Sequence, residues 1–130
     1  MNKYNGEFTS REDVAFVFEE VRGGSYWDRK NATINETFPT EDEIIYANYD
    51  VYGYEGSAFV VFEHDGDLFE VHGSHCSCFG LEGQWSPEPT SWEAIATWNP
   101  AYSGVTKEIV DEAKRRVAAK EAVASAKQEL

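Results

Sequence analysis

Both cysteines of the chain lie in one short segment beside two of its three histidines. The segment, residues 73–85, reads GSHCSCFGLEGQW, and His72 directly precedes it. Histidine nitrogens and cysteine thiolates are the ligands that zinc prefers, and a structural zinc site takes four of them in a tetrahedron. Alternate residues of an extended chain share a face, so His72, Cys76 and Cys78 are the candidate metal ligands.

The histidines and cysteines of this sequence do not complete such a tetrahedron. His75 points away from the face that carries Cys76, and His64 lies more than about 20 Å away along an extended strand. A C-x-C pair usually needs further ligands from a second segment, and no second Cys or His pair occurs. We therefore predict no resident metal and no cofactor, and keep a zinc or thiol site as an alternative.

A catalytic cysteine is a further possible use of the segment. The thiolate needs an imidazole within hydrogen-bond reach. His75 faces away from Cys76, which leaves His72, and a carboxylate-rich surrounding disfavours a thiolate. The competing interpretation makes both cysteines small buried hydrophobes at the end of a strand, among turns formed by glycines. We predict this structural role and no enzymatic activity.

Charge is distributed unevenly along the chain. It carries 24 acidic and 11 basic residues, a formal net charge of −13, yet residues 31–104 contain no Lys or Arg and thirteen acids. A negative field of this kind steers association with positively charged partners. We predict the partner-binding residues to be acids at two turns together with two aromatic anchors: Glu41, Asp42, Glu43, Tyr52, Tyr54, Asp65 and Asp67.

The elements that must position these residues can be derived from hydrophobic periodicity and turn signals. Capping boxes beginning at Thr9 and Thr90 predict a helix over 11–22, which a glycine pair at 23–24 ends, and a short helix near 91–98. A sparse apolar stripe predicts a long helix from about Thr106 to the C-terminus. Runs of β-forming residues predict strands over 43–50, 57–63 and 68–73.

The Asp65-Gly66 pair predicts a two-residue hairpin turn, because both residues can adopt a positive φ. With this turn, paired positions sum to 131, so Val60 faces Val71 and Phe59 faces His72. One face of the hairpin is then wholly apolar and belongs to the core. The opposite face is mixed, and it is either half-solvated or covered by another element.

Together these elements predict an α+β fold. A small antiparallel sheet of three to four strands packs with the three helices. A chain of 130 residues has the size of one domain. Residues 1–104 form its acidic core, and residues 105–130 form a C-terminal helix of the same domain, whose last turns protrude or fray. A helix with so thin an apolar stripe could also form a homodimer.

The segment from Tyr54 to Ile95 resembles a segment found in small uncharacterised proteins of bacteriophages and bacteria. The specific part of the resemblance is GSHCSC-x-GLEGQW followed by a Pro-Glu pair. It covers about a third of the chain and brings no known activity or functional residue. What it implies is a phage-type origin and action inside a bacterial cell.

These features predict a small interaction protein of phage type. We expect it to inhibit a bacterial nucleic-acid-binding or defence protein, such as a nuclease, by presenting a DNA-mimic-like negative surface to a basic one. Direct nucleic-acid binding is not expected, because phosphate contacts require Lys and Arg. No long apolar run and no secretory-signal core occur, so we expect the bacterial cytoplasm and no membrane contact. An accessory assembly protein that uses the C-terminal helix is the remaining alternative.

Overall fold

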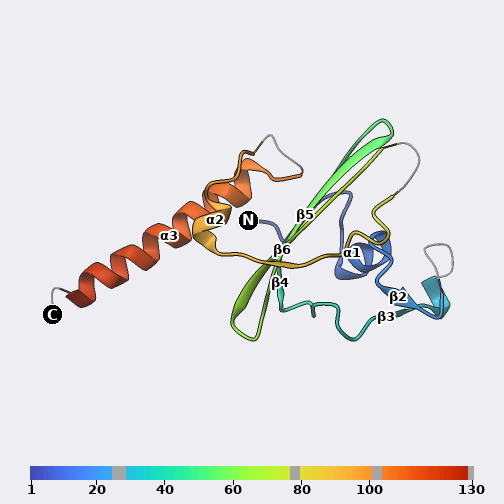
Figure 1. Cartoon of the computed structure of the whole chain (residues 1–130), viewed down its shortest axis with the longest axis horizontal. Coiled ribbons are helices and arrows are strands. Elements are labelled where there is room, and N and C mark those ends of the chain that lie inside the picture. Colours follow the sequence, from blue (N-terminus) through green and yellow to red (C-terminus); the bar gives the residue numbers. More distant parts are fainter. Residues whose placement is uncertain (25–28, 77–79, 101–103, 129–130) are drawn as a thin grey trace.

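Three long antiparallel strands form the centre of the protein (Figure 1). The computed structural model describes residues 1–24, 29–76, 80–100 and 104–128. The strands are β4 (Ile44–Tyr52), β5 (Glu55–His64) and β6 (Asp67–His75). β5 and β6 pair in the predicted register, Val60 with Val71 and Phe59 with His72. Asp65 and Gly66 both have positive φ, 51° and 83°, as a two-residue hairpin turn requires.

Two short strands extend the sheet at its edges to the order β1-β4-β5-β6-β7. β1 (Tyr4–Gly6) pairs in parallel with β4, and β7 (Glu88–Pro89) pairs with the start of β6. The predicted α+β class is confirmed, but the sheet has five strands and one parallel pair. Segments of two or three residues are too short to show an alternating pattern, so only the tertiary pairing reveals them.

The first helix, α1 (Arg11–Val17), is shorter than the predicted 11–22. Its N-cap is Ser10, whose hydroxyl accepts the Asp13 N–H at 3.2 Å, and not Thr9. The helix ends where Glu19 adopts a positive φ of 54°, before the glycine pair at 23–24. The next residues form a small ribbon of β2 (Val21–Arg22) and β3 (Thr33–Ile34), with a 3₁₀ turn at Arg29–Asn31 between them.

Both faces of the central sheet are covered by helices of the same chain. Ala58, Val60 and Val71 pack with α1 in one core. Phe59 and Val61, on the opposite face, pack in a second core beneath α2 (Trp92–Ile95) and α3 (Lys107–Gln128). Figure 1 shows α1 and α3 on opposite sides of the strands. The mixed face of the hairpin is therefore covered and not half-solvated.

Among the α3 side chains that the structure describes, residues 107–123, those in the second core come from the first turns. Ile109, Val110 and Ala113 are buried, whereas residues 118–123 are all exposed. Figure 1 shows the C-terminal half of α3 extending away from the other elements. No helix in the described ranges combines the length and the apolar character that crossing a bilayer requires.

The two ends of α3 should therefore differ in their contribution to stability. Ile109→Ala should lower the free energy of unfolding by about 2–5 kcal/mol, because Ile109 is fully buried between α3 and the sheet. Val123→Ala is the matched control and should change it by no more than about 0.5 kcal/mol, since Val123 is 56% exposed. Urea unfolding followed by circular dichroism measures both variants. Equal losses would show that the whole helix is packed.

Candidate functional site

The cysteine-containing segment folds back along the free side of β6. Leu81 is fully buried beside Gly73, which has no side chain to displace it. Trp85 packs its ring on Phe18 and Phe38, with centroids at 5.1 and 4.7 Å. The segment thereby closes the α1 core. The expected burial of both cysteines is wrong for Cys76, which is exposed because it lies just beyond the end of β6, and Cys78 lies outside the described residues.

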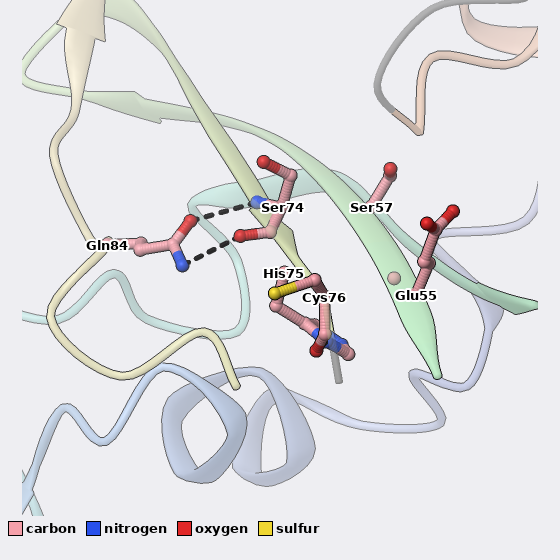
Figure 2. A pocket seen from close by; sticks show the side chains of 7 residues that line it. Glu55, Ser57, Ser74, His75, Cys76 and Gln84 are labelled. Carbon is pink, nitrogen blue, oxygen red and sulfur yellow. Dashed lines mark hydrogen bonds between the residues drawn. The ribbon is translucent and has the colours of Figure 1, made fainter. Parts of the chain in front are cut away.

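Gln84 holds this returning segment to the edge of β6. Its side-chain carbonyl accepts the Ser74 N–H at 2.9 Å, and its amide donates to the Ser74 carbonyl at 2.8 Å. Figure 2 shows both bonds, drawn from the one side chain to the one strand residue. β7 pairs only with residues 69–70 of β6, so Gln84 supplies at Ser74 the two bonds that a neighbouring strand would make.

His75 has a structural partner on β4. Its Nε2 lies 2.5 Å from the Tyr49 hydroxyl, and its Nδ1 lies 2.9 Å from the Cys76 carbonyl oxygen. A carbonyl only accepts, so Nδ1 carries a proton. The ring reaches Tyr49 across Gly56, where a Cβ would collide with His75 Nε2. Both ring nitrogens are engaged, and His75 cannot serve as a base for the Cys76 thiol while these bonds hold.

The candidate zinc ligands do not come together among the described residues. His72 lies on the α3 side of the sheet, where its ring contacts Phe59 and Trp98 at 4.8 and 4.9 Å. Cys76 is exposed beyond the end of β6, and Cys78 lies outside the described residues. No group of three His, Cys, Asp or Glu side chains that could hold a metal is found in the described ranges.

His72 belongs instead to a buried polar cluster between the sheet and α2. Its Nε2 lies 3.6 Å from Glu70 Oε2, and the Trp98 indole N–H donates to the same oxygen at 3.1 Å. Glu70 is only 7% exposed, and the Trp98 N–H compensates this carboxylate for its removal from water, whereas His72 Nε2 has no hydrogen-bond partner among the described residues. The arrangement anchors the segment after α2 to the sheet.

A pocket of about 480 Å³ lies beside Cys76. Glu55, Ser57 and Ser74 line it with His75, Cys76 and Gln84, as Figure 2 shows. The thiol faces this pocket with a carboxylate nearby and without a free imidazole. This arrangement lacks the base that a nucleophilic cysteine requires.

The predicted acidic residues form a cluster at the opposite end of the sheet. The turn before β4 carries Glu41, Asp42 and Glu43, and the β5–β6 turn lies next to it. His64 connects the two, with Nδ1 2.5 Å from Glu43 Oε2 and Nε2 3.3 Å from Asp65 Oδ2. We call this cluster the acidic end; its members are Glu41, Asp42, Glu43, Glu63, Asp65 and Asp67.

His64 and Glu43 perturb each other's protonation. The hydrogen bond to Glu43 and the charge of Asp65 raise the pKa of His64, with a further contribution from Asp67. The pKa of Glu43 is lowered, first by the bond from the Thr40 N–H and then by His64. His64 is thus a titratable group placed among the carboxylates of the acidic end. The sequence pattern does not indicate this role, because the partner carboxylate Glu43 is 21 positions away.

Basic residues from outside the 31–104 window neutralise part of its charge. Lys3 lies 3.7 Å from Glu41, which also accepts the Tyr4 hydroxyl at 2.6 Å. Arg22 pairs with Glu36 at 3.1 Å. Over the described part of the chain, the five other members of the acidic end make no ion pair with Lys or Arg.

The predicted aromatic anchors do not join this cluster. Tyr52 and Tyr54 are 78% and 80% exposed, and they lie at the β4–β5 turn. Figure 1 shows the β4–β5 and β5–β6 turns at opposite ends of the sheet. The ten residues of β5 separate the two turns by about 30 Å. The predicted contact residues therefore form two surfaces.

Comparison with protein-family models, curated proteins and solved structures finds no match to this chain.

Replacing Gln84 tests its role as a substitute strand. Gln84→Ala should lower the free energy of unfolding by about 1 kcal/mol and speed hydrogen exchange at the Ser74 amide, because both bonds to Ser74 are lost. Gln84→Glu is the matched control, since it keeps the acceptor and should leave that amide protected. Exchange is measured by NMR with the β5 amides as internal reference. Unchanged exchange in Gln84→Ala would contradict the role.

The acidic end should be visible in the titration of His64. NMR titration should give its imidazole a pKa above the usual value of about 6.5, and Glu43→Gln should lower that pKa. Glu82→Gln, an exposed charge in another loop, is the control and should have little effect. Because the folded-state pKa of His64 is raised, the stabilisation by this pair is complete below about pH 6.5, as long as Glu43 is ionised, and is lost as pH rises through the folded-state pKa. A pKa unchanged by Glu43→Gln would contradict the pairing.

Proposed function

We propose that this protein binds the basic surface of a bacterial host protein through the acidic end of its sheet. The observation that carries the proposal is the set of five carboxylates there that have no Lys or Arg partner in the described structure. Asp42, Glu63, Asp65 and Asp67 are exposed, and Glu43 is half-buried. Their charge is therefore not neutralised by Lys or Arg, and only His64 contacts two of them, Glu43 and Asp65, among the described residues.

Physical considerations favour binding to a cationic protein surface. Clustered charges of one sign raise association rates with oppositely charged partners and disfavour binding to partners of the same charge. Exposed carboxylates on a turn offer acceptor oxygens for Arg and Lys, in the manner of nucleic-acid phosphates. A nuclease or another nucleic-acid-binding defence protein exposes such a basic surface. Occupying it would block the partner's own substrate, which makes the protein an inhibitor of phage type.

The cysteine end supports a catalytic function less well. His75 is held by Tyr49 and the Cys76 carbonyl, and Gln84 is engaged with Ser74. The groups around Cys76 thus serve the fold. Tyr52 and Tyr54 offer a second, smaller contact surface beside Cys76.

The proposal predicts that binding depends on where charge is removed and not only on how much. A triple variant of the acidic end, Asp42→Asn with Asp65→Asn and Asp67→Asn, should weaken affinity for the captured partner by about tenfold, at roughly 0.5 kcal/mol per exposed charge. The matched control removes three exposed charges elsewhere, Glu55→Gln with Glu82→Gln and Glu121→Gln, and should retain most of the affinity.

The measurement is an affinity pull-down from bacterial lysate, followed by titration with the purified partner. Raising salt from about 0.1 M to about 1 M shortens the Debye length from about 10 Å to about 3 Å and should release the partner. Capture that survives high salt, or equal loss in the two triple variants, would refute binding through the acidic end.

A further inference from the structure

A pocket of about 440 Å³ opens at the acidic end on the α1 side of the sheet. Phe38, Phe62, Phe69 and Pro87 form most of its wall. Three charged or titratable side chains also line it: Glu36 is exposed, Glu43 is half-buried, and His64 joins Glu43 at 2.5 Å. Pockets of this size hold small ligands or single side chains of a partner. An apolar wall with carboxylates beside it suits a cationic group that also has a flat or aliphatic part.

The aromatic wall is rigidly supported. The Phe62 and Phe69 rings stack at 5.3 Å with an angle of 19° between their planes, and Trp85 stacks behind Phe62 at 5.8 Å and 15°. Phe62 is buried and Phe69 is half-buried, so Phe69 is the more accessible ring. A guanidinium group is planar and stacks on such faces, whereas an ammonium group is a compact point charge that stays strongly hydrated.

Arginines of the same chain already bind next to this pocket. The Arg11 guanidinium lies 5.4 Å from the centroid of the Phe38 ring, and Arg11 Nε donates to the Pro39 carbonyl at 2.5 Å. Arg22 Nη2 pairs with Glu36 at 3.1 Å. Aromatic, carbonyl and carboxylate groups around the pocket thus recognise guanidinium within the fold itself. Among the described residues, the Glu43 carboxylate bonds only to His64 and to the Thr40 N–H.

We propose that this pocket binds one arginine side chain of the basic partner, an inference that rests on the proposed function. The side chain would stack on the exposed face of Phe69, and its guanidinium would bond to Glu36 and Glu43. A protonated His64 competes with the guanidinium for Glu43 and repels it. The charges of Asp65 and Asp67, which also face His64, stabilise its protonated form. Binding should therefore strengthen as pH rises through the measured midpoint of His64.

Two peptides of equal charge test the proposal: acetyl-Gly-Arg-Gly-Arg-Gly-amide and its lysine counterpart. Both are titrated into the labelled protein and followed by NMR above the His64 midpoint. The arginine peptide should bind about threefold to tenfold more tightly, as expected for one stacked guanidinium, and should shift the ring resonances of Phe62 and Phe69. The lysine peptide should shift the acidic turns with little effect on the rings.

Three variants locate the site. Phe69→Leu keeps the apolar volume and removes the ring face, so it should abolish the preference for arginine while leaving lysine binding unchanged. Glu36→Gln removes an exposed carboxylate whose surface ion pair with Arg22 contributes little to folding. It should weaken binding of the arginine peptide by about threefold, for the loss of one exposed ion pair. Glu55→Gln, the matched control at the other end of the sheet, should have a much smaller effect.

The outcomes separate this proposal from the proposed function. Equal, salt-dependent binding of both peptides with unchanged ring resonances would overturn the arginine pocket and leave binding through the acidic end standing. Failure of both peptides to bind would also overturn the pocket, whereas the acidic end is judged separately by the pull-down with its two triple variants. A preference for arginine that persists in Phe69→Leu would place the recognition elsewhere and overturn the pocket as well.

Discussion

The central strand β5 buries both of its faces, and the remaining structure depends on this constraint. Ala58, Phe59, Val60 and Val61 follow one another along the strand and are all fully buried. Neither sheet face can then remain open to water, so α1 must cover one side and α2 with α3 the other. Each layer brings its own apolar residues, which gives two separate cores on the two sides of one strand.

This constraint also decides where charge can lie. Carboxylates are costly on a covered face, and the one that is buried there, Glu70, is bonded to Trp98. The other acids of the β4–β6 region collect at the turns, at the two ends of the sheet. The acidic end then holds a surplus of negative charge around a single histidine, which makes its field sensitive to pH. Its neighbouring aromatic pocket lies where the α1 core reaches the end of the sheet.

The cysteine segment illustrates how a motif composed of potential metal ligands and nucleophiles can have a structural role. Its histidine bonds to Tyr49, its glutamine pairs with the edge of β6, and its leucine and tryptophan close the α1 core. His75, Leu81 and Trp85 have partners from distant parts of the chain, whereas Gln84 bonds within the segment, to Ser74. The residue types alone match zinc or thiol chemistry, and only their partners distinguish the structural role from a catalytic one.

The sequence by itself determined the features that depend on neighbours along the chain. The Asp65-Gly66 turn set the register of β5 with β6, and alternation then assigned each side chain of the hairpin to a face. Hydrophobic periodicity located the helices. At α1 the cap is one residue later than predicted, at Ser10, and the helix ends five residues earlier, because Glu19 takes the positive φ expected of the glycine pair.

Tertiary structure alone decided what depends on distant pairing. β1 and β7 are too short to carry a pattern, and the bulge near Ile45 in β4, where the register with β5 shifts, leaves no periodic signal. The contact of His64 with Glu43, the neutralisation of Glu41 by Lys3, and the separation of Tyr52 and Tyr54 from the acidic end all follow from how strands lie in space. Charge content is a property of composition, but whether charges share one surface depends on which ends of the strands the fold brings together.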